Sequence, residues 1–147
     1  MKFIPAIILL LSLFTFMVSC NPDVQEVKDR KLIEDYLKDN NLQAEKTESG
    51  LYYIITVPGN NEHPAQSDNV HINYIGSLLN GNVFDSNPSA TFLLGDLIDG
   101  MREGIPLLGK GGEGTFIIPS ELGYGSISHP GIPANSVTIF EVKLIGF

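Results

Sequence analysis

The amino-acid sequence predicts an α+β domain in which five or six β-strands surround one short α-helix. Runs of β-branched and aromatic residues recur from residue 51 onward, and clusters rich in Gly, Pro, Asn and Ser separate them. Only one stretch within this region has the apolar spacing of a helix. The length of 147 residues fits one compact domain with short additional segments.

The strand candidates follow one another along most of the chain. We expect strands within residues 51–57, 69–79, 82–86, 90–95, 115–119 and 137–147. The pair Asn80–Gly81 predicts a two-residue type I′ turn between the second and third of them, because both central residues of that turn need positive φ. Residues 120–136 are rich in Gly, Pro and Ser, so we expect a long loop there.

Residues 96–109 are the helical candidate inside the domain. Ile98, Met101 and Ile105 recur at helical spacing. Gly104 weakens this helix and Pro106 ends it, because proline lacks the amide N–H that a helix interior requires. We therefore expect a helix of about two turns.

The polar segment 20–47 predicts a further helix before the domain. Ile33, Tyr36 and Leu37 share one helical face, and acidic residues precede basic ones, as the helix dipole favours. The pair Asn40–Asn41 is a plausible end of this helix. It is either a dimerisation or docking helix, or a helix that packs on its own domain or spaces the domain from a membrane. We favour the second interpretation, because a single short apolar stripe is usually a local packing face.

Residues 1–19 have the pattern of a bacterial lipoprotein signal peptide. Lys2 precedes an apolar run, and the small Ser19 stands directly before Cys20. The residues MVSC resemble a lipobox, in which the cysteine becomes the lipidated first residue of the mature chain. An ordinary secretory signal with an incidental cysteine is the alternative. The pattern predicts a bacterial envelope protein, anchored to a membrane by a lipid on Cys20 and facing the periplasm or the cell exterior. It divides the chain into residues 1–19, 20–47 and 48–147.

Charge and motif content argue against several classes of function. The formal net charge is −8 and no basic stripe is present, so we expect no nucleic-acid partner. His63, His71 and His129 lack the spacing of metal ligands, so we expect no metal site. The sequence holds no motif of a serine hydrolase, zinc protease or P-loop nucleotidase, and the glycine-rich residues 109–114 precede a strand rather than a helix.

Three stretches, taken in their order along the chain, carry a family resemblance. They read VHINYIGSLLNGNVFDS, FLLGDLIDGMREGIPLLGKGGEGTFIIPSELGYG and HPGIPANSVTIFEVKLI. Together they resemble the FKBP-type peptidyl-prolyl cis-trans isomerases, closely from Val70 to Ile145. The resemblance implies a bent antiparallel sheet wrapped around the short helix, with an apolar pocket between them. It also implies isomerase activity that needs no cofactor, proline-containing polypeptide clients, and macrolide ligands of the FK506 or rapamycin type.

The resemblance assigns the pocket residue by residue. Its catalytic positions are Tyr74, Phe84, Asp85 and Phe140. Its substrate-binding positions are Phe92, Leu97, Ile98, Met101, Tyr124, His129 and Ile132. Asp85, an acid at the end of an apolar strand, is expected at the pocket rim, where it orients Tyr74 or a bound carbonyl. Its alternative role is to pin the loop that follows the strand.

The implied mechanism needs no nucleophile. Rotation about an Xaa–Pro bond crosses a barrier of ~20 kcal/mol because it breaks amide resonance. The twisted amide has a less polarised carbonyl than the planar amide, so an apolar pocket lowers the relative barrier. Aromatic edges and a backbone N–H, which we expect to be that of Ile98, hold the proline and a neighbouring carbonyl.

The sequence departs from the family pattern at three places. Met101 stands where the pocket floor is usually Trp, and Ala90 replaces an aromatic residue two positions before Phe92. Residues 86–90 lack the basic residue that some members place opposite the aspartate. These changes keep a second interpretation open: a weakly catalytic or non-catalytic chaperone or binding module with an FKBP-like pocket.

Overall fold

The structure is a computed structural model that describes residues 23–147. Six strands form one antiparallel sheet in the order β1-β2-β5-β6-β3-β4. The elements are α1 Val24–Asp39, β1 Glu45–Lys46, β2 Tyr52–Val57, β3 Asn69–Leu78, β4 Val83–Leu93, α2 Asp99–Gly104, β5 Glu113–Ile118 and β6 Thr138–Gly146. Short 3₁₀ turns are η1 Leu94–Asp96, η2 Ile105–Leu107 and η3 Ser120–Leu122. The predicted α+β class is confirmed.

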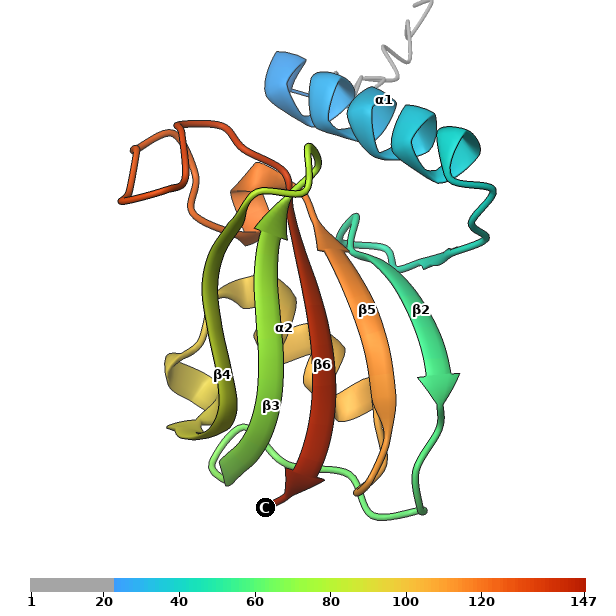
Figure 1. The fold of residues 1–147 in the computed structure, drawn as a ribbon, viewed down its shortest axis with the longest axis vertical. Coiled ribbons are helices and arrows are strands. Elements are labelled where there is room, and N and C mark those ends of the chain that lie inside the picture. The colour runs from blue at the N-terminus through green and yellow to red at the C-terminus, as the bar shows by residue number, and fades with distance from the viewer. Residues whose placement is uncertain (1–22) are drawn as a thin grey trace, which may run out of the picture.

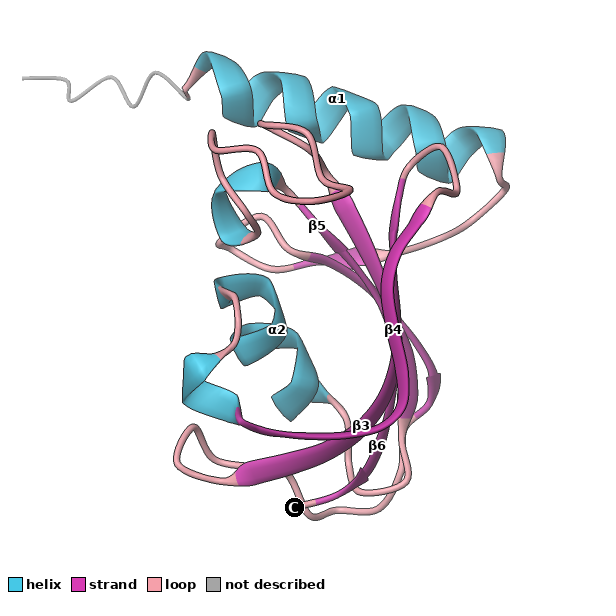
Figure 2. Ribbon diagram, turned by 60° about the vertical axis from the view of Figure 1, so that its left-hand side comes forward, coloured by secondary structure: helices cyan, strands magenta, loops and turns pink. Residues whose placement is uncertain are grey.

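The sheet bends around α2, which lies in its hollow (Figure 2). Side chains alternate between the two faces of each strand, so every second residue faces α2. Phe116 and Ile118 of β5 and Phe140, Val142 and Leu144 of β6 share this concave face and are buried in one cluster. The cluster fills the space between sheet and helix and forms the main core.

Two glycines let α2 approach the sheet closely. A Cβ added at Gly100 would lie 2.5 Å from Cγ2 of Ile118, and one added at Gly104 would lie 2.8 Å from the ring of Phe116. The helix is as short as expected, because it gives way to η2 at Ile105 and Pro106 follows within that turn. Gly104 therefore has a packing role in addition to its low helix propensity.

Helix α1 crosses one end of the sheet (Figure 1). It begins after Asp23, whose side chain accepts a hydrogen bond from the Gln25 N–H, and it ends at Asn40. Ile33 is fully buried in a second cluster, on the sheet face opposite α2, with Tyr52, Ile117, Val137 and Ile139. The interpretation that this helix packs on its own domain is therefore confirmed.

The hairpin between β3 and β4 differs from the prediction. The prediction of a type I′ turn was wrong. Gly81 has φ 85°, but Asn80 is not among the residues with positive φ. The N–H of Gly81 donates to the Leu78 carbonyl (2.9 Å), and the N–H of Leu78 donates to the Asn82 carbonyl (2.9 Å), which closes a three-residue loop. Asn80 instead accepts a hydrogen bond from the Asn82 N–H through its side chain. One glycine thus supplies the only positive φ that this longer loop needs.

The two strands expected at 82–86 and 90–95 are one continuous strand, β4. The pairing with β3 shifts register between Ile72, which faces Ala90, and Tyr74, which faces Asn87. Pro88 lies in this bulge. Because β4 is an edge strand, the N–H that Pro88 lacks interrupts no hydrogen bonds between inner strands of the sheet. Residues 87–89, between the two expected strands, are therefore a bulged part of one strand.

The signal peptide expected at 1–19 and the lipidated Cys20 lie outside the described residues. Within residues 23–147, no helix has both the length and the apolar character needed to cross a membrane.

Gly100→Ala should destabilise the domain by about 1–3 kcal/mol, because the added methyl group overpacks against Ile118. Gly146→Ala is the matched control, since its Cβ would meet only Lys110 at 3.7 Å, an ordinary contact. Urea unfolding of both variants and of the wild type measures the difference. Equal unfolding midpoints for the two variants would contradict the close packing of α2.

Candidate functional site

A pocket of about 240 Å³ opens between the concave face of the sheet and α2. Strands β3, β4 and β6 supply one wall, and η1, the following residues and α2 supply the other. Tyr124 completes the wall from the long loop after β5. The lining residues are Ile72, Tyr74, Asp85, Phe92, Asp96, Leu97, Ile98, Met101, Tyr124 and Phe140. Most are apolar or aromatic, so the pocket suits an apolar ligand with a few polar groups.

Other surface hollows have a different character. One of about 460 Å³ lies on the opposite face of the sheet, over β2, β3, β5 and β6. Thr56, Asn73 and the ion pair between Lys143 and Glu113 (2.7 Å) contribute to its lining. These polar, partly exposed side chains leave the concave pocket as the better candidate for an apolar ligand.

Aromatic rings form most of the strand side of the pocket. The Tyr74 ring lies 6.0 Å from that of Phe92 and 6.3 Å from that of Phe140, measured between ring centroids. Phe84 packs edge-on against Phe140 at 5.6 Å and against Tyr124 at 6.0 Å. Such tilted and edge-on contacts fix each ring in orientation as well as position.

Gly76 makes this arrangement of rings possible. A Cβ added to it would lie 2.7 Å from the Phe84 ring and 3.0 Å from the Phe140 ring. The two rings therefore meet over bare backbone of β3, at the position directly opposite Phe140 in the sheet register.

One hydrogen bond joins the two polar side chains of the strand wall. The Tyr74 hydroxyl donates to Oδ2 of Asp85 at 2.6 Å. Burial, and next the hydrogen bond to Asp85, raise the pKa of Tyr74 to about 12. Burial and the nearby Asp85 charge also raise the pKa of Tyr124. Among the described residues, no backbone N–H donates to Asp85, and the hydrogen bond from Tyr74 is its one side-chain contact.

A free backbone donor lies where the helical side of the pocket begins. Ile98 caps α2, and its carbonyl accepts hydrogen bonds from the N–H groups of Met101 (2.9 Å) and Arg102 (3.0 Å). Its own N–H has no acceptor within residues 23–147. This N–H is therefore unpaired beside Leu97 and Met101 of the pocket lining.

Three predicted site residues lie beside the pocket rather than on its lining. Phe84 supports the rings of Phe140 and Tyr124 from behind. The His129 ring lies tilted against that of Tyr124, with 5.3 Å between the ring centroids, and its backbone pairs with that of Ile132 in an isolated bridge. His129 and Ile132 line a neighbouring hollow instead. The other eight predicted residues all line the pocket.

Two lining residues were not predicted from the sequence. Ile72 is two positions before Tyr74 in β3, so the alternation of the strand could have placed it on the same face. Asp96 ends η1 directly before Leu97. No sequence pattern distinguished it from an ordinary exposed turn acid.

Met101 forms the floor of the pocket and is only 3% exposed. Its flexible thioether fills the space without the flat surface that an aromatic ring would supply. Ala90 is buried in the core opposite Ile72 in β3. Both departures from the family pattern therefore lie at or under the pocket.

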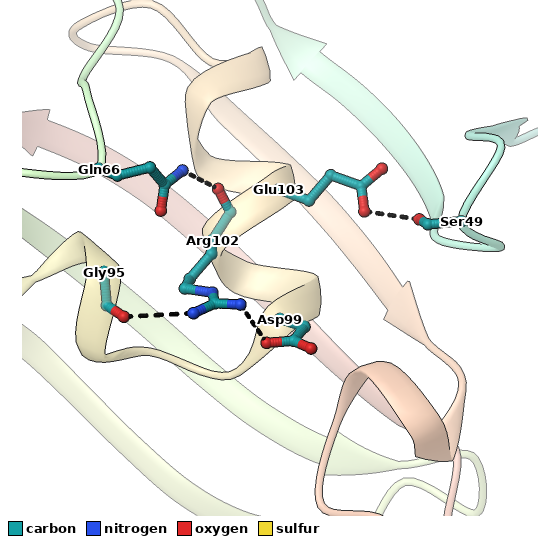
Figure 3. Close-up of polar contacts among 6 residues, drawn as sticks. All are labelled: Ser49, Gln66, Gly95, Asp99, Arg102 and Glu103. Carbon is teal, nitrogen blue, oxygen red and sulfur yellow. Dashed lines mark hydrogen bonds and ion pairs between the residues drawn. The ribbon is translucent and has the colours of Figure 1, made fainter.

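Polar contacts hold α2 in place beneath the pocket (Figure 3). The Gln66 side-chain amide donates to the Arg102 carbonyl at 2.8 Å, and the Arg102 guanidinium bonds the Asp99 carboxylate. At the other side of the helix, the Ser49 hydroxyl donates to Glu103 at 2.6 Å. Ser49 lies before β2 and Gln66 after it, so two other segments hold the helix, while the Arg102–Asp99 pair lies within it.

The described residues contain no cluster of three or more His, Cys, Asp or Glu side chains placed to hold a metal ion. The pocket itself combines apolar walls with the Tyr74–Asp85 pair and the unpaired Ile98 N–H.

The family profile of FKBP-type peptidyl-prolyl cis-trans isomerases matches residues 60–145. The chain belongs to this family. The resemblance found in the sequence is thus confirmed, and the matched residues include every residue that lines the pocket.

Relatives of known name agree with this assignment. The chain is 36% identical over 124 residues to the FKBP-type peptidyl-prolyl cis-trans isomerase FkpA of Escherichia coli, covering 82% of this chain and 45% of that protein. It is 43% identical over 105 residues to FkpA of Buchnera aphidicola subsp. Schizaphis graminum, covering 68% and 42%. The chain therefore spans less than half the length of these relatives.

Solved structures share the fold. The crystal structure of Escherichia coli FkpA has a TM-score of 0.74 and 35% identity, covering 83% of this chain and 58% of that one. The crystal structure of AtFKBP13 has a TM-score of 0.65 and 31% identity, covering 71% and 98%. The bent sheet around a short helix is thus the fold of this family.

Asp85→Val should lower the pKa of Tyr74 from about 12 while leaving it above the ordinary value of 10, because burial is the larger cause of the shift. A pH titration of ¹³C-labelled tyrosine ring signals measures it, with Tyr74→Phe identifying the signal. An unchanged Tyr74 pKa in Asp85→Val would contradict the hydrogen bond as a cause.

The same raised pKa makes the stability of the domain fall in alkali. The unfolded chain releases the Tyr74 proton near pH 10 and the folded domain near pH 12, so the free energy of unfolding falls between these values. Tyr74→Phe should flatten this fall in urea unfolding measured across the range. An equally steep fall of the free energy of unfolding in that variant would show that groups other than Tyr74 cause it.

Proposed function

We propose that this chain catalyses cis-trans isomerisation of Xaa–Pro bonds in polypeptide clients, and that the concave pocket is its active site. The supporting observation is an aromatic pocket in which one hydroxyl–carboxylate pair, Tyr74 and Asp85, is joined by a short hydrogen bond. Membership in the FKBP family supports the reaction. Escherichia coli FkpA, a relative of which this chain spans 45% of the length, carries the same activity in its name.

In this proposal each wall of the pocket has a role. The proline ring enters between Tyr74, Phe92 and Phe140, above the Met101 floor. The Ile98 N–H donates to a substrate carbonyl next to the proline. Asp85 holds the Tyr74 hydroxyl in one orientation at the rim. The apolar walls remove water from the amide, which disfavours the polar planar form more than the twisted form and so lowers the barrier of ~20 kcal/mol.

The remaining predicted residues support the pocket. Leu97 and Tyr124 close its sides, Phe84 fixes the rings of Phe140 and Tyr124, and His129 and Ile132 hold the loop that carries Tyr124. The proposed reaction uses no metal or cofactor, because rotation about the Xaa–Pro bond breaks no covalent bond.

A second candidate function is a chaperone or binding module that turns over slowly. The observation that favours it is Met101, since a flexible floor holds a proline ring less rigidly than an aromatic one. Macrolides of the FK506 or rapamycin type are proposed ligands of the same pocket under either function.

The location of the protein is also a proposal. We place it in the bacterial envelope, anchored through a lipid on Cys20, with 1–19 as signal peptide, 20–47 as a helical linker and 48–147 as the isomerase domain. Its clients would then be proline-containing envelope or secreted polypeptides. The sequence pattern around Cys20 supports this placement.

The two candidate functions differ in turnover. A protease-coupled assay on short Ala-Pro, Leu-Pro and Phe-Pro peptides should show isomerisation above the uncatalysed rate at micromolar protein. Binding of the same peptides without any acceleration would support the binding module and contradict the isomerase.

Two substitutions should separate catalysis from stability. Asp85→Val removes an exposed carboxylate with one side-chain contact, so turnover should fall more than the thermal midpoint. Phe140→Leu should lower turnover and also destabilise the fold, by less than the ~3–5 kcal/mol typical of Phe→Ala, because Phe140 is in the core. Both quantities are measured on the same preparation. A large drop in the midpoint of Asp85→Val with normal turnover per folded molecule would assign Asp85 a structural role only.

Cys20→Ser should release the protein from the membrane fraction or block its processing, because serine carries no thiol for the lipid. Fractionation of cells that express each form, with mass spectrometry of the mature N-terminus, measures this. A serine variant that is processed and membrane-bound like the wild type would contradict the anchor.

A further inference from the structure

Helix α1 places a charged side chain in the interior of the protein. Asp29 is fully buried, and among the described residues it is the only buried charged side chain. Its Oδ2 accepts hydrogen bonds from both the N–H (2.8 Å) and the hydroxyl (2.6 Å) of Ser120, which lies 91 residues later in the chain. Its Oδ1 accepts a further bond from the Gln25 side chain at 2.7 Å.

A buried carboxylate is a costly means of docking a helix. Removing it from water carries a large penalty that the hydrogen bonds must offset, and an apolar side chain of similar size often docks equally well. Ile33 already provides such docking one helical turn later, in the cluster with Tyr52, Ile117, Val137 and Ile139. Docking of the helix alone therefore does not account for the two hydrogen bonds that Asp29 accepts from Ser120.

Ser120 organises the turn that carries Tyr124. It opens η3, and its carbonyl accepts hydrogen bonds from the N–H groups of Gly123 (3.0 Å) and Gly125 (2.8 Å). These two glycines flank Tyr124 in the sequence. Asp29 fixes the N–H and hydroxyl of Ser120, and the Ser120 carbonyl fixes the backbone on both sides of Tyr124.

Tyr124 in turn forms part of the pocket wall. Its ring packs edge-on against Phe84 at 6.0 Å and lies 5.3 Å from the His129 ring. No residue of α1 lines the pocket. The successive contacts from Asp29 through Ser120 to the backbone around Tyr124 thus link α1 to the pocket wall.

We propose that Asp29 is a positioning residue, which fixes the turn from Ser120 to Gly125 and thereby holds Tyr124 in the wall of the pocket. The N-terminal helix is then part of the apparatus that shapes the binding site. The consequence for turnover rests on the proposed function, whereas the position of the Tyr124 ring does not.

The test compares three full-length variants, Asp29→Asn, Ser120→Ala and the double variant, with the full-length wild type. Asp29→Asn keeps the size of the side chain but places an amide N–H near the donors of Ser120. Ser120→Ala removes only the hydroxyl and keeps the N–H bond, so it remains informative if Asp29→Asn fails to fold. Ile33→Val is the matched control, because it weakens docking of the same helix without touching Ser120.

The first readout is the set of ¹³C-tyrosine ring signals of Tyr124, assigned with Tyr124→Phe. We expect Asp29→Asn and Ser120→Ala to shift or broaden them, the double variant to add little to either, and Ile33→Val to leave them in place. Unchanged Tyr124 signals in both folded variants, or an equal change in Ile33→Val, would overturn the proposal.

The second readout is the split between KM and kcat on an Xaa–Pro peptide. A displaced Tyr124 should raise KM several-fold with a smaller change in kcat, whereas Ile33→Val should change neither beyond its folded fraction. A fall in kcat alone would contradict positioning of the wall. If the wild type shows no turnover, the proposed function fails, and the Tyr124 signals still decide the role of Asp29.

Discussion

The pocket depends on how closely α2 lies in the hollow of the bent sheet. Gly100 and Gly104 remove the side chains that would hold the helix away from Ile118 and Phe116. The helix is also short, so it covers only part of the concave face. Over β3, β4 and β6, the rings of Tyr74, Phe92 and Phe140 on that face line the pocket.

Within this apolar space, polar groups are few, and two of the side chains pair with one another. Tyr74 and Asp85 satisfy one another at 2.6 Å, and the Ile98 N–H remains open. An unpaired hydroxyl in such a pocket would be costly, so the exposed Asp85 allows Tyr74 to occupy an apolar wall. The acid that stood out in the sequence after Phe84 is explained by this pairing across two neighbouring strands.

The sequence predicted those features that depend on local pattern or on family order. Alternation and turn residues located the strands, and Gly104 with Pro106 predicted the length of α2. Family order brought together Tyr74, Asp85 and Phe140, which no local rule could place in one pocket. Ile72 was missed although alternation in β3 pointed to it.

Features that depend on tertiary context were not predictable in the same way. The loop at Asn80–Gly81 follows the register of two long strands, and several turn types fit the same pair of residues. Continuity of β4 through Pro88 depends on its being an edge strand, which is a property of the whole sheet. The burial of Asp29 depends on Ser120, 91 residues away, so an acid on a polar helix gave no sign of it.

The central claim is that the concave pocket receives the proline of a client chain. A titration of the ¹⁵N- and ¹³C-labelled protein with a short Leu-Pro peptide tests it most directly. The account predicts perturbations at the Ile98 N–H and at the rings of Tyr74, Phe92, Tyr124 and Phe140, with the opposite face of the sheet, around Thr56 and Lys143, unaffected. Perturbations confined to that opposite face or to α1, with the pocket signals unchanged, would contradict it.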